Sequence, residues 1–219
     1  MTVVKKLGYE LKFDLNEAKK RVDFLDKLRI DRALSDTTES FQLVFKLIPL
    51  LLHFNHPDLP GYVANAPTGI ARFSLSGFQQ DYLARTLSEE QRKNIQKNHR
   101  TFEQEAILGV YVMGSIASIA QTPSSDLDIW ICHREDLSQS ALELLQQKTN
   151  VIQQCAKRFQ VEINFYLMDQ KRFRGFRYTE LMDGENCGST QYMLLLDEFY
   201  RSAIRLAGKP LLWLHLLVE

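Results

Sequence analysis

The chain has 219 residues, and 45% of them are apolar, which is enough to bury a core of ordinary size. Lysine and arginine together number 27, as do aspartate and glutamate, so the formal net charge is zero. This balance argues against nucleic acid or an anionic membrane as a partner, because both attract proteins with a basic surplus. No apolar stretch approaches the roughly 18 residues of a membrane span.

The cysteines indicate the compartment. Cys132, Cys155 and Cys187 lack the spacing of a metal site. Their odd number and the absence of a signal peptide favour reduced thiols, so we expect a cytoplasmic protein.

The first hundred residues are predicted to be mainly helical. Asp14 stands three residues before Glu17, a variant of the capping box, and starts a helix that runs to about residue 33. A second helix is expected over residues 39–53, bent or started afresh at Pro49.

Two weaker segments follow. Residues 56–69 contain three prolines and two glycines, which predicts an irregular loop. Residues 76–99 are polar and charged, which predicts an exposed helix broken around residues 86–88.

A Gly-Ser turn between two apolar runs is the most informative feature of the chain. Residues 106–113 predict a buried strand, and Gly114 and Ser115 follow it. A second apolar run, residues 127–131, predicts a strand that contains Asp128 and follows Asp126. Side chains alternate between the faces of a strand, so these two carboxylates project from one side, roughly 6–7 Å apart. Such a pair repels unless a cation lies between the groups, and Mg²⁺ is the usual cation.

This pattern resembles the signature of the DNA polymerase β-like nucleotidyltransferase superfamily. The resemblance implies an α/β (α+β) fold, with a mixed sheet flanked by helices and an N-terminal helical segment before it. The pattern along the chain places the helical segment at residues 1–100 and the catalytic core, truncated at its C-terminus, at residues 101–219, unless the two form one continuous domain. In that superfamily the Gly-Ser turn opens a helix, whose N-terminus attracts the nucleotide phosphates.

A third carboxylate is expected on a later strand, and Glu162 is the candidate. A helix is predicted over residues 138–159, and residues 161–167 then alternate as a strand with its apolar side chains on one face. Glu162 therefore points to the other face. Further on, residues 169–188 predict a loop that carries several basic side chains. A last helix is expected from about residue 190 to residue 206, stopped by Gly208 and the two residues after it.

The residues around the turn resemble, more narrowly, the class I adenylate cyclases of the enterobacterial type. The resemblance rests on Gly-Ser-x-x-Ser, followed by the run Ser-Ser-Asp-Leu-Asp-Ile-Trp-Ile-Cys that ends before His133. Matching segments extend from about residue 14 to residue 213. Members of that family are several times longer, so the resemblance implies an N-terminal portion of the catalytic region. The resemblance allows for a regulatory C-terminal region and regulatory proteins as partners, neither of which is visible in this sequence.

That family forms cyclic AMP and pyrophosphate from ATP, by attack of the ribose 3′-hydroxyl on the α-phosphorus. The resemblance implies two Mg²⁺ ions, with Mn²⁺ as a substitute, as cofactors. The catalytic and metal-binding residues that it implies are Asp126, Asp128 and Glu162. The substrate-binding residues that it implies are Gly114, Ser115, Ser118, Ser125 and Trp130. Trp130 follows Asp128 by two residues, so it either packs beneath the metals or stacks on the adenine.

Two alternatives stay open at this point. Nucleotidyl transfer and cyclisation differ only in the source of the attacking hydroxyl, so an enzyme that modifies a separate acceptor would carry the same motif. A nucleotide-binding module that is inactive without the rest of a longer chain would carry it too.

Overall fold

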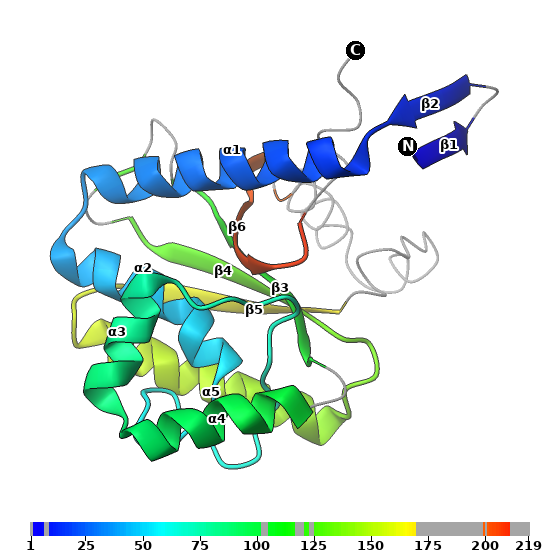
Figure 1. Ribbon diagram of the computed structural model, residues 1–219. Helices are drawn as coiled ribbons and strands as arrows, with labels where there is room; N and C mark the ends of the chain where they lie inside the picture. Colours follow the sequence, from blue (N-terminus) through cyan, green and yellow to red (C-terminus); the bar gives the residue numbers. More distant parts are fainter. Residues whose placement is uncertain are drawn as a thin grey trace, which may run out of the picture.

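The fold is described from a computed structural model, which places residues 2–6, 9–101, 105–116, 121, 122, 125–169, 199 and 201–210 (Figure 1). The helices in this part of the chain are α1 (Leu15–Ser35), α2 (Glu39–His53), α3 (Gly77–Thr86), α4 (Glu89–Thr101) and α5 (Gln139–Lys157). The strands are β1 (Thr2–Lys6), β2 (Tyr9–Phe13), β3 (Ile107–Met113), β4 (Leu127–His133), β5 (Ile163–Asp169) and β6 (Ile204–Gly208).

A four-stranded mixed sheet organises the molecule, in the order β5-β4-β3-β6. β3 runs antiparallel to both of its neighbours, whereas β4 and β5 are parallel. α5 connects β4 to β5, because a parallel pair needs a crossover between its strands. The predicted α/β class and the mixed sheet flanked by helices are therefore confirmed.

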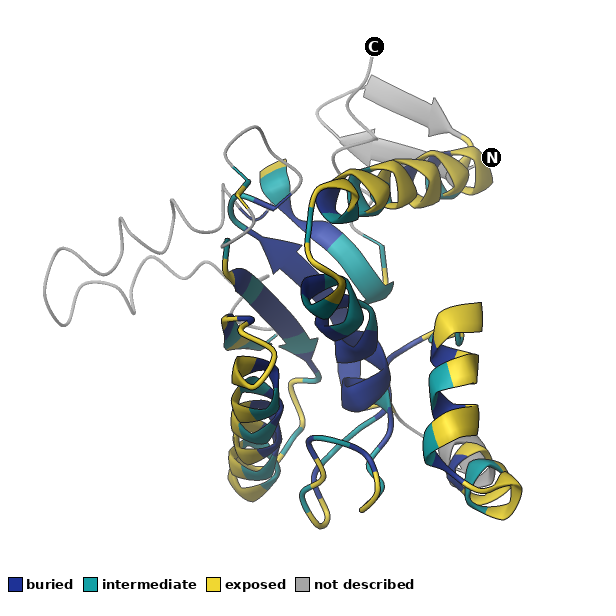
Figure 2. Cartoon of the chain, turned by 90° about the vertical axis from the view of Figure 1, so that its left-hand side faces the viewer, coloured by how far each residue is buried: buried dark blue, intermediate teal, exposed yellow. Residues whose placement is uncertain are grey.

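The two faces of the sheet are covered differently. On one face, buried side chains such as Val110, Val112, Ile129 and Ile131 share a single core with α2 and α5. α2 is buried on most of its sides, which suits a helix that is apolar almost all round (Figure 2). The helical segment and the sheet therefore pack around the same core.

The alternate residues of β3 and β4 point to the opposite face. There Tyr111, Met113 and Trp130 form a second, smaller cluster with Phe199 and Ala203. Asp128 lies on this face as well, because it occupies the position two residues before Trp130. The candidate chemistry thus lies on the face away from α2 and α5.

Most predicted helices are confirmed. The side chain of Asp14 caps α1 by accepting from the backbone N–H groups of Asn16 and Glu17, at 2.8 and 3.3 Å. The predicted break near residue 87 separates α3 from α4. The restart expected at Pro49 is wrong, since α2 runs through it. Nine buried side chains of α2 outweigh the one hydrogen bond that proline removes.

Two segments differ from the expectation. β1 and β2, residues 2–6 and 9–13, pair antiparallel at the start of a region predicted to be helical. The helix expected to reach residue 206 is wrong at its end, because residues 204–208 form β6 against β3; its first part, residues 190–198, lies outside the described residues. Gly208 has φ +94°, and a Cβ on it would lie 2.5 Å from the Cα of Gly109. This glycine therefore permits close strand pairing instead of ending a helix.

A helix crosses a membrane only if it is both long enough and apolar enough to span the hydrocarbon layer. No helix of the described residues combines that length with that apolar character.

Candidate active site

A tight turn after β3 brings a glycine beside a carboxylate. Residues 114–116 form this turn, and Met113, the last residue of β3, pairs with Asp128 on β4. Gly114 has φ +80°, a conformation that costs other residues energy, and a Cβ on it would lie 3.3 Å from Oδ2 of Asp128. Glycine therefore keeps the space next to this carboxylate open.

One amide joins the two aspartates. Nδ2 of Asn164 donates to Oδ2 of Asp126 and to Oδ1 of Asp128, at 3.1 Å in each case. The parallel register of β4 and β5 pairs Asp128 with Asn164, which sets this contact. The structure thus brings Asp126 and Asp128 together on one side of the sheet, as the alternation predicted.

The pair lies in an environment that disfavours negative charge. Burial raises the pKa of the Asp128 carboxyl, and the charge of Asp126 raises it further, while the hydrogen bonds from Asn164 and Tyr166 act in the opposite direction. Burial, and then the charges of Asp128 and Asp126, raise the pKa of the Tyr166 hydroxyl in turn. A cation beside the two carboxylates would relieve both effects.

Hydroxyl groups line the turn. Oγ of Ser115 donates to Oγ of Ser125 at 3.1 Å, and the latter oxygen also accepts from the backbone N–H of Thr122 at 2.8 Å. Two hydroxyls therefore lie together next to the Gly-Ser turn. Ser118 and the helix expected after the turn fall outside the described residues.

Glu162 lies at the same end of the sheet. It immediately precedes β5, and its backbone carbonyl accepts from the N–H of Leu127 at 2.9 Å. Its side chain is exposed. Within the described ranges, no three His, Cys, Asp or Glu side chains gather as a set of metal ligands. The role of Glu162 as a third metal ligand therefore stays a prediction.

Trp130 packs inside the protein. Its side chain is 4% exposed and stacks on the ring of Phe199, with centroids 4.9 Å apart and planes at 18°. Tyr111 contacts the same phenylalanine edge to face, with centroids 5.2 Å apart. Of the two roles considered for Trp130, this arrangement favours packing beneath the carboxylates.

Asn164 and Tyr166 were not identified from the sequence. The alternation that directed Glu162 away from the apolar face of β5 applies equally to residues 164 and 166. Combined with the parallel register of β4 and β5, this alternation would have placed Asn164 beside Asp128 and Tyr166 beside Trp130. Of the loop predicted over residues 169–188, only Asp169 is described, and it ends β5. The basic side chains of this loop lie outside the described residues.

Comparison with known proteins gives a consistent result. The model of a family described as "Adenylate cyclase NT domain" matches residues 14–214. An adenylate cyclase of Pasteurella multocida is 63% identical over 210 residues, which are 95% of this chain and 25% of that protein. One from Haemophilus influenzae is 54% identical over 94% of this chain and 25% of its own length. One from Escherichia coli is 43% identical over 89% of this chain and 23% of its own length. The chain spans about a quarter of the length of these curated relatives.

Proposed function

The chain belongs to the family of the adenylate cyclase N-terminal domain, and from this we propose that it carries the catalytic centre of an enzyme that converts ATP to cyclic AMP and pyrophosphate. The observation that carries the proposal is the pair of carboxylates joined by Asn164 beside the open space at Gly114. Relatives that bear the name adenylate cyclase share most of this sequence.

The donor set fits Mg²⁺, because carboxylate and hydroxyl oxygens are the ligands that this ion takes, together with phosphate oxygens and water. Asp126 and Asp128 would hold two ions, and Glu162 would complete the set for one of them. When bound, the ions would supply positive charge to the reacting phosphate and lower the pKa of the attacking hydroxyl.

The remaining residues would position the nucleotide. The turn at Gly114 and the hydroxyls of Ser115 and Ser125 would donate hydrogen bonds to phosphate oxygens, and Ser118 is proposed for the same role. In the reaction, the ribose 3′-oxygen forms a bond to the α-phosphorus, the bond to pyrophosphate breaks, and the hydroxyl proton passes to solvent water. Holding the hydroxyl in line with the departing group is the main contribution of such a site.

We place this reaction in the cytoplasm, where ATP is abundant. Cys132 and Cys155 are free thiols, in keeping with a reducing compartment.

The direct test is to supply Mg²⁺ and labelled ATP and to separate the products. The assay should use both this chain and a protein of the full family length. Free cyclic AMP supports the proposal, whereas label attached to an acceptor would show a transferase. If only the longer protein is active, the chain contains the centre but needs the remaining segments.

Variants then test the site itself. Asp126→Asn and Asp128→Asn should each abolish cyclic AMP formation while the fold is kept. Ser115→Ala should weaken ATP binding, since a hydrogen bond to a charged oxygen contributes roughly 1.5–3 kcal/mol. Glu162→Gln should slow turnover more than it weakens ATP binding. More than a tenth of the wild-type rate in Asp128→Asn would exclude the two-metal assignment.

A further inference from the structure

A second cleft lies away from the carboxylate pair, between α1, α2, residues 72–79 and the edge strand β6. Its volume is about 470 Å³, which is in the range of small-molecule sites. Gly208, which lines the cleft, pairs with Gly109, whereas Asp128 pairs with Met113 at the other end of β3. Four residues of strand, roughly 13 Å, separate these two positions along β3. The cleft is therefore distinct from the candidate active site.

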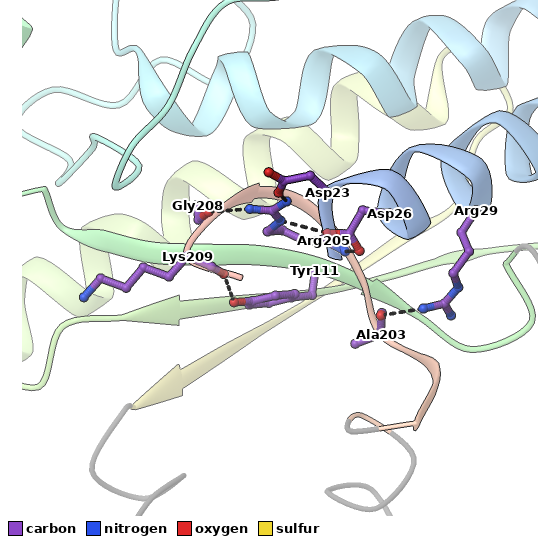
Figure 3. A network of polar contacts seen from close by, with 8 residues as sticks. All are labelled: Asp23, Asp26, Arg29, Tyr111, Ala203, Arg205, Gly208 and Lys209. Carbon is purple, nitrogen blue, oxygen red and sulfur yellow. Dashed lines mark hydrogen bonds and ion pairs between the residues drawn. The ribbon is translucent and has the colours of Figure 1, made fainter. Parts of the chain in front are cut away.

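The charges around this cleft are unequal. Arg205 is engaged by Asp26 and Asp23, so these three groups largely satisfy one another (Figure 3). Three further cations line the cleft: Lys27, Lys46 and Arg72. None of these three forms an ion pair with any residue that the structure describes. Counted together with Asp23, Asp26 and Arg205, these cations leave the cleft with a surplus of two positive charges, which an anion of two charges would balance.

Hydrogen-bond donors and apolar walls complete the cleft. Ser74 and Ser76 line it, and Ser76 is the N-cap of α3, whose first turn adds the positive end of a helix dipole. Phe45, Pro49 and Phe73 provide apolar walls. A ligand that matches these surfaces carries a charged group at one end and a flat apolar group at the other.

Arg72 is held in an unusual backbone conformation at this position. Its φ is +56°, in the left-handed region, which costs a non-glycine residue about 1–2 kcal/mol. The residues on either side are fixed, since Ala71 N–H donates to the carbonyl of Ile107 at 2.8 Å and Phe73 N–H to that of Ile70 at 3.2 Å. Residues held in this way are common at ligand-binding positions.

Lys46 is only lightly engaged. Its Nζ lies 3.4 Å from Oε1 of Gln42 and 5.4 Å from the ring centroid of Phe78. Both are weak contacts, so the ammonium group is available to a ligand in the cleft.

We propose that this cleft binds a small organic phosphate, with the phosphate between Lys46, Arg72 and the start of α3, and the apolar part against Phe45 and Phe73. Such a ligand would bind without Mg²⁺, because its charge is balanced by the protein itself. It would also bridge α1, α2 and β6, and so would stabilise the docking of α1.

Phenyl phosphate is a suitable probe, and phenol is its uncharged match. Binding to the chain is followed by titration calorimetry in EDTA, so that a metal-dependent site stays empty. Phenyl phosphate should bind in a saturable manner, and phenol at least about tenfold more weakly, because each charge-assisted hydrogen bond contributes 1.5–3 kcal/mol.

Variants locate the binding. The double variant Lys46→Gln/Arg72→Gln should lose at least tenfold in affinity for phenyl phosphate. The matched control, Lys157→Gln/Arg158→Gln at the exposed end of α5, removes the same charge from outside the cleft and should bind like the wild type. Circular dichroism checks that each variant is folded. Absence of saturable binding, equal binding of phenol, or equal losses in the two double variants would each overturn the proposal.

Discussion

The guanidinium group of Arg205, on β6, donates to the carboxylate of Asp26, on α1, at 2.9 Å (Figure 3). Both side chains are largely buried, at 19% and 14% exposure. Arg205 also contacts Asp23 and the carbonyl of Gly208. In contrast, Phe24 and Leu28 on α1 are exposed. Charged contacts thus contribute much of the attachment of α1 to the edge of the sheet.

We therefore expect Arg205→Gln to destabilise the protein by about 2 kcal/mol, because it leaves two carboxylates and a carbonyl without their donor. Asp26→Asn should lower the free energy of unfolding by a smaller amount. Burial raises the pKa of Asp26 in spite of its partner, so the neutral amide avoids a desolvation cost that the charged group bears. Urea unfolding of both variants measures the difference.

The double variant Asp26→Asn/Arg205→Gln provides the control. If the pair acts as a unit, the two losses will not add, because the second change finds its partner already removed. Additive losses would show that each residue acts independently of the other.

Lys148 gives a prediction about pH. It is 1% exposed, and its Nζ donates to the carbonyls of Phe54 and Gly61, at 3.2 and 3.0 Å, and to Oδ1 of Asn55 at 3.1 Å. Burial lowers the pKa of this ammonium group to about 7. It ties α5 to the loop after α2 and has no carboxylate partner in the described residues.

The sign of the effect follows from linkage. An unfolded lysine keeps its proton up to about pH 10.4, so between pH 7 and pH 10 the unfolded state binds more protons than the folded state. The free energy of unfolding should therefore rise with pH across this window, by up to about 1.4 kcal/mol for each pH unit from this one group. Below pH 7 Lys148 is protonated in both states, so this group no longer adds to the free energy of unfolding.

Lys148→Met is the matched variant, since it keeps the volume and removes the titrating group. We expect the difference in unfolding free energy between wild type and variant to change in favour of the wild type from pH 7 to pH 9. Urea unfolding at three pH values measures it, and other titrating groups cancel in the comparison. Parallel curves would contradict the assignment.

The sequence was a good guide wherever local patterns decide the structure. The cap at Asp14, the strands on either side of Gly114 and the common side of Asp126 and Asp128 all follow from spacing. The predictions from sequence failed where pairing between distant segments determines the structure. Residues 204–206 have side chains that suit a helix, but the exposed edge of β3 recruits them into β6. Asn164 was missed because its importance depends on the register between two strands.

Trp130 offers a spectroscopic test of its packing. The chain has two tryptophans, and the second, Trp213, lies outside the described residues. In a Trp213→Phe variant all indole emission comes from Trp130, which Phe199 covers on one side. We expect emission at short wavelength, weak quenching by acrylamide, and no further protection when ATP and Mg²⁺ are added. Strong quenching that ATP prevents would instead indicate stacking on the adenine.

The last prediction concerns Asn164 and the charge balance of the site. Asn164→Asp replaces a donor to both aspartates by a third carboxylate at the same position. Without a divalent ion, the repulsion should lower the melting temperature below that of the wild type. Asp128→Asn should have the opposite effect, because burial and the neighbouring charge already disfavour the ionised form of Asp128.

Mg²⁺ then separates a metal site from a merely crowded one. Added at millimolar concentration, it should raise the melting temperature of Asn164→Asp by more than that of the wild type, and that of Asp128→Asn by the least, since ion binding follows the number of carboxylates. Calorimetric scans in EDTA and in Mg²⁺ measure all three proteins. Identical responses to Mg²⁺ would mean that the ion binds elsewhere, and that Asn164 serves only to hold the two carboxylates in place.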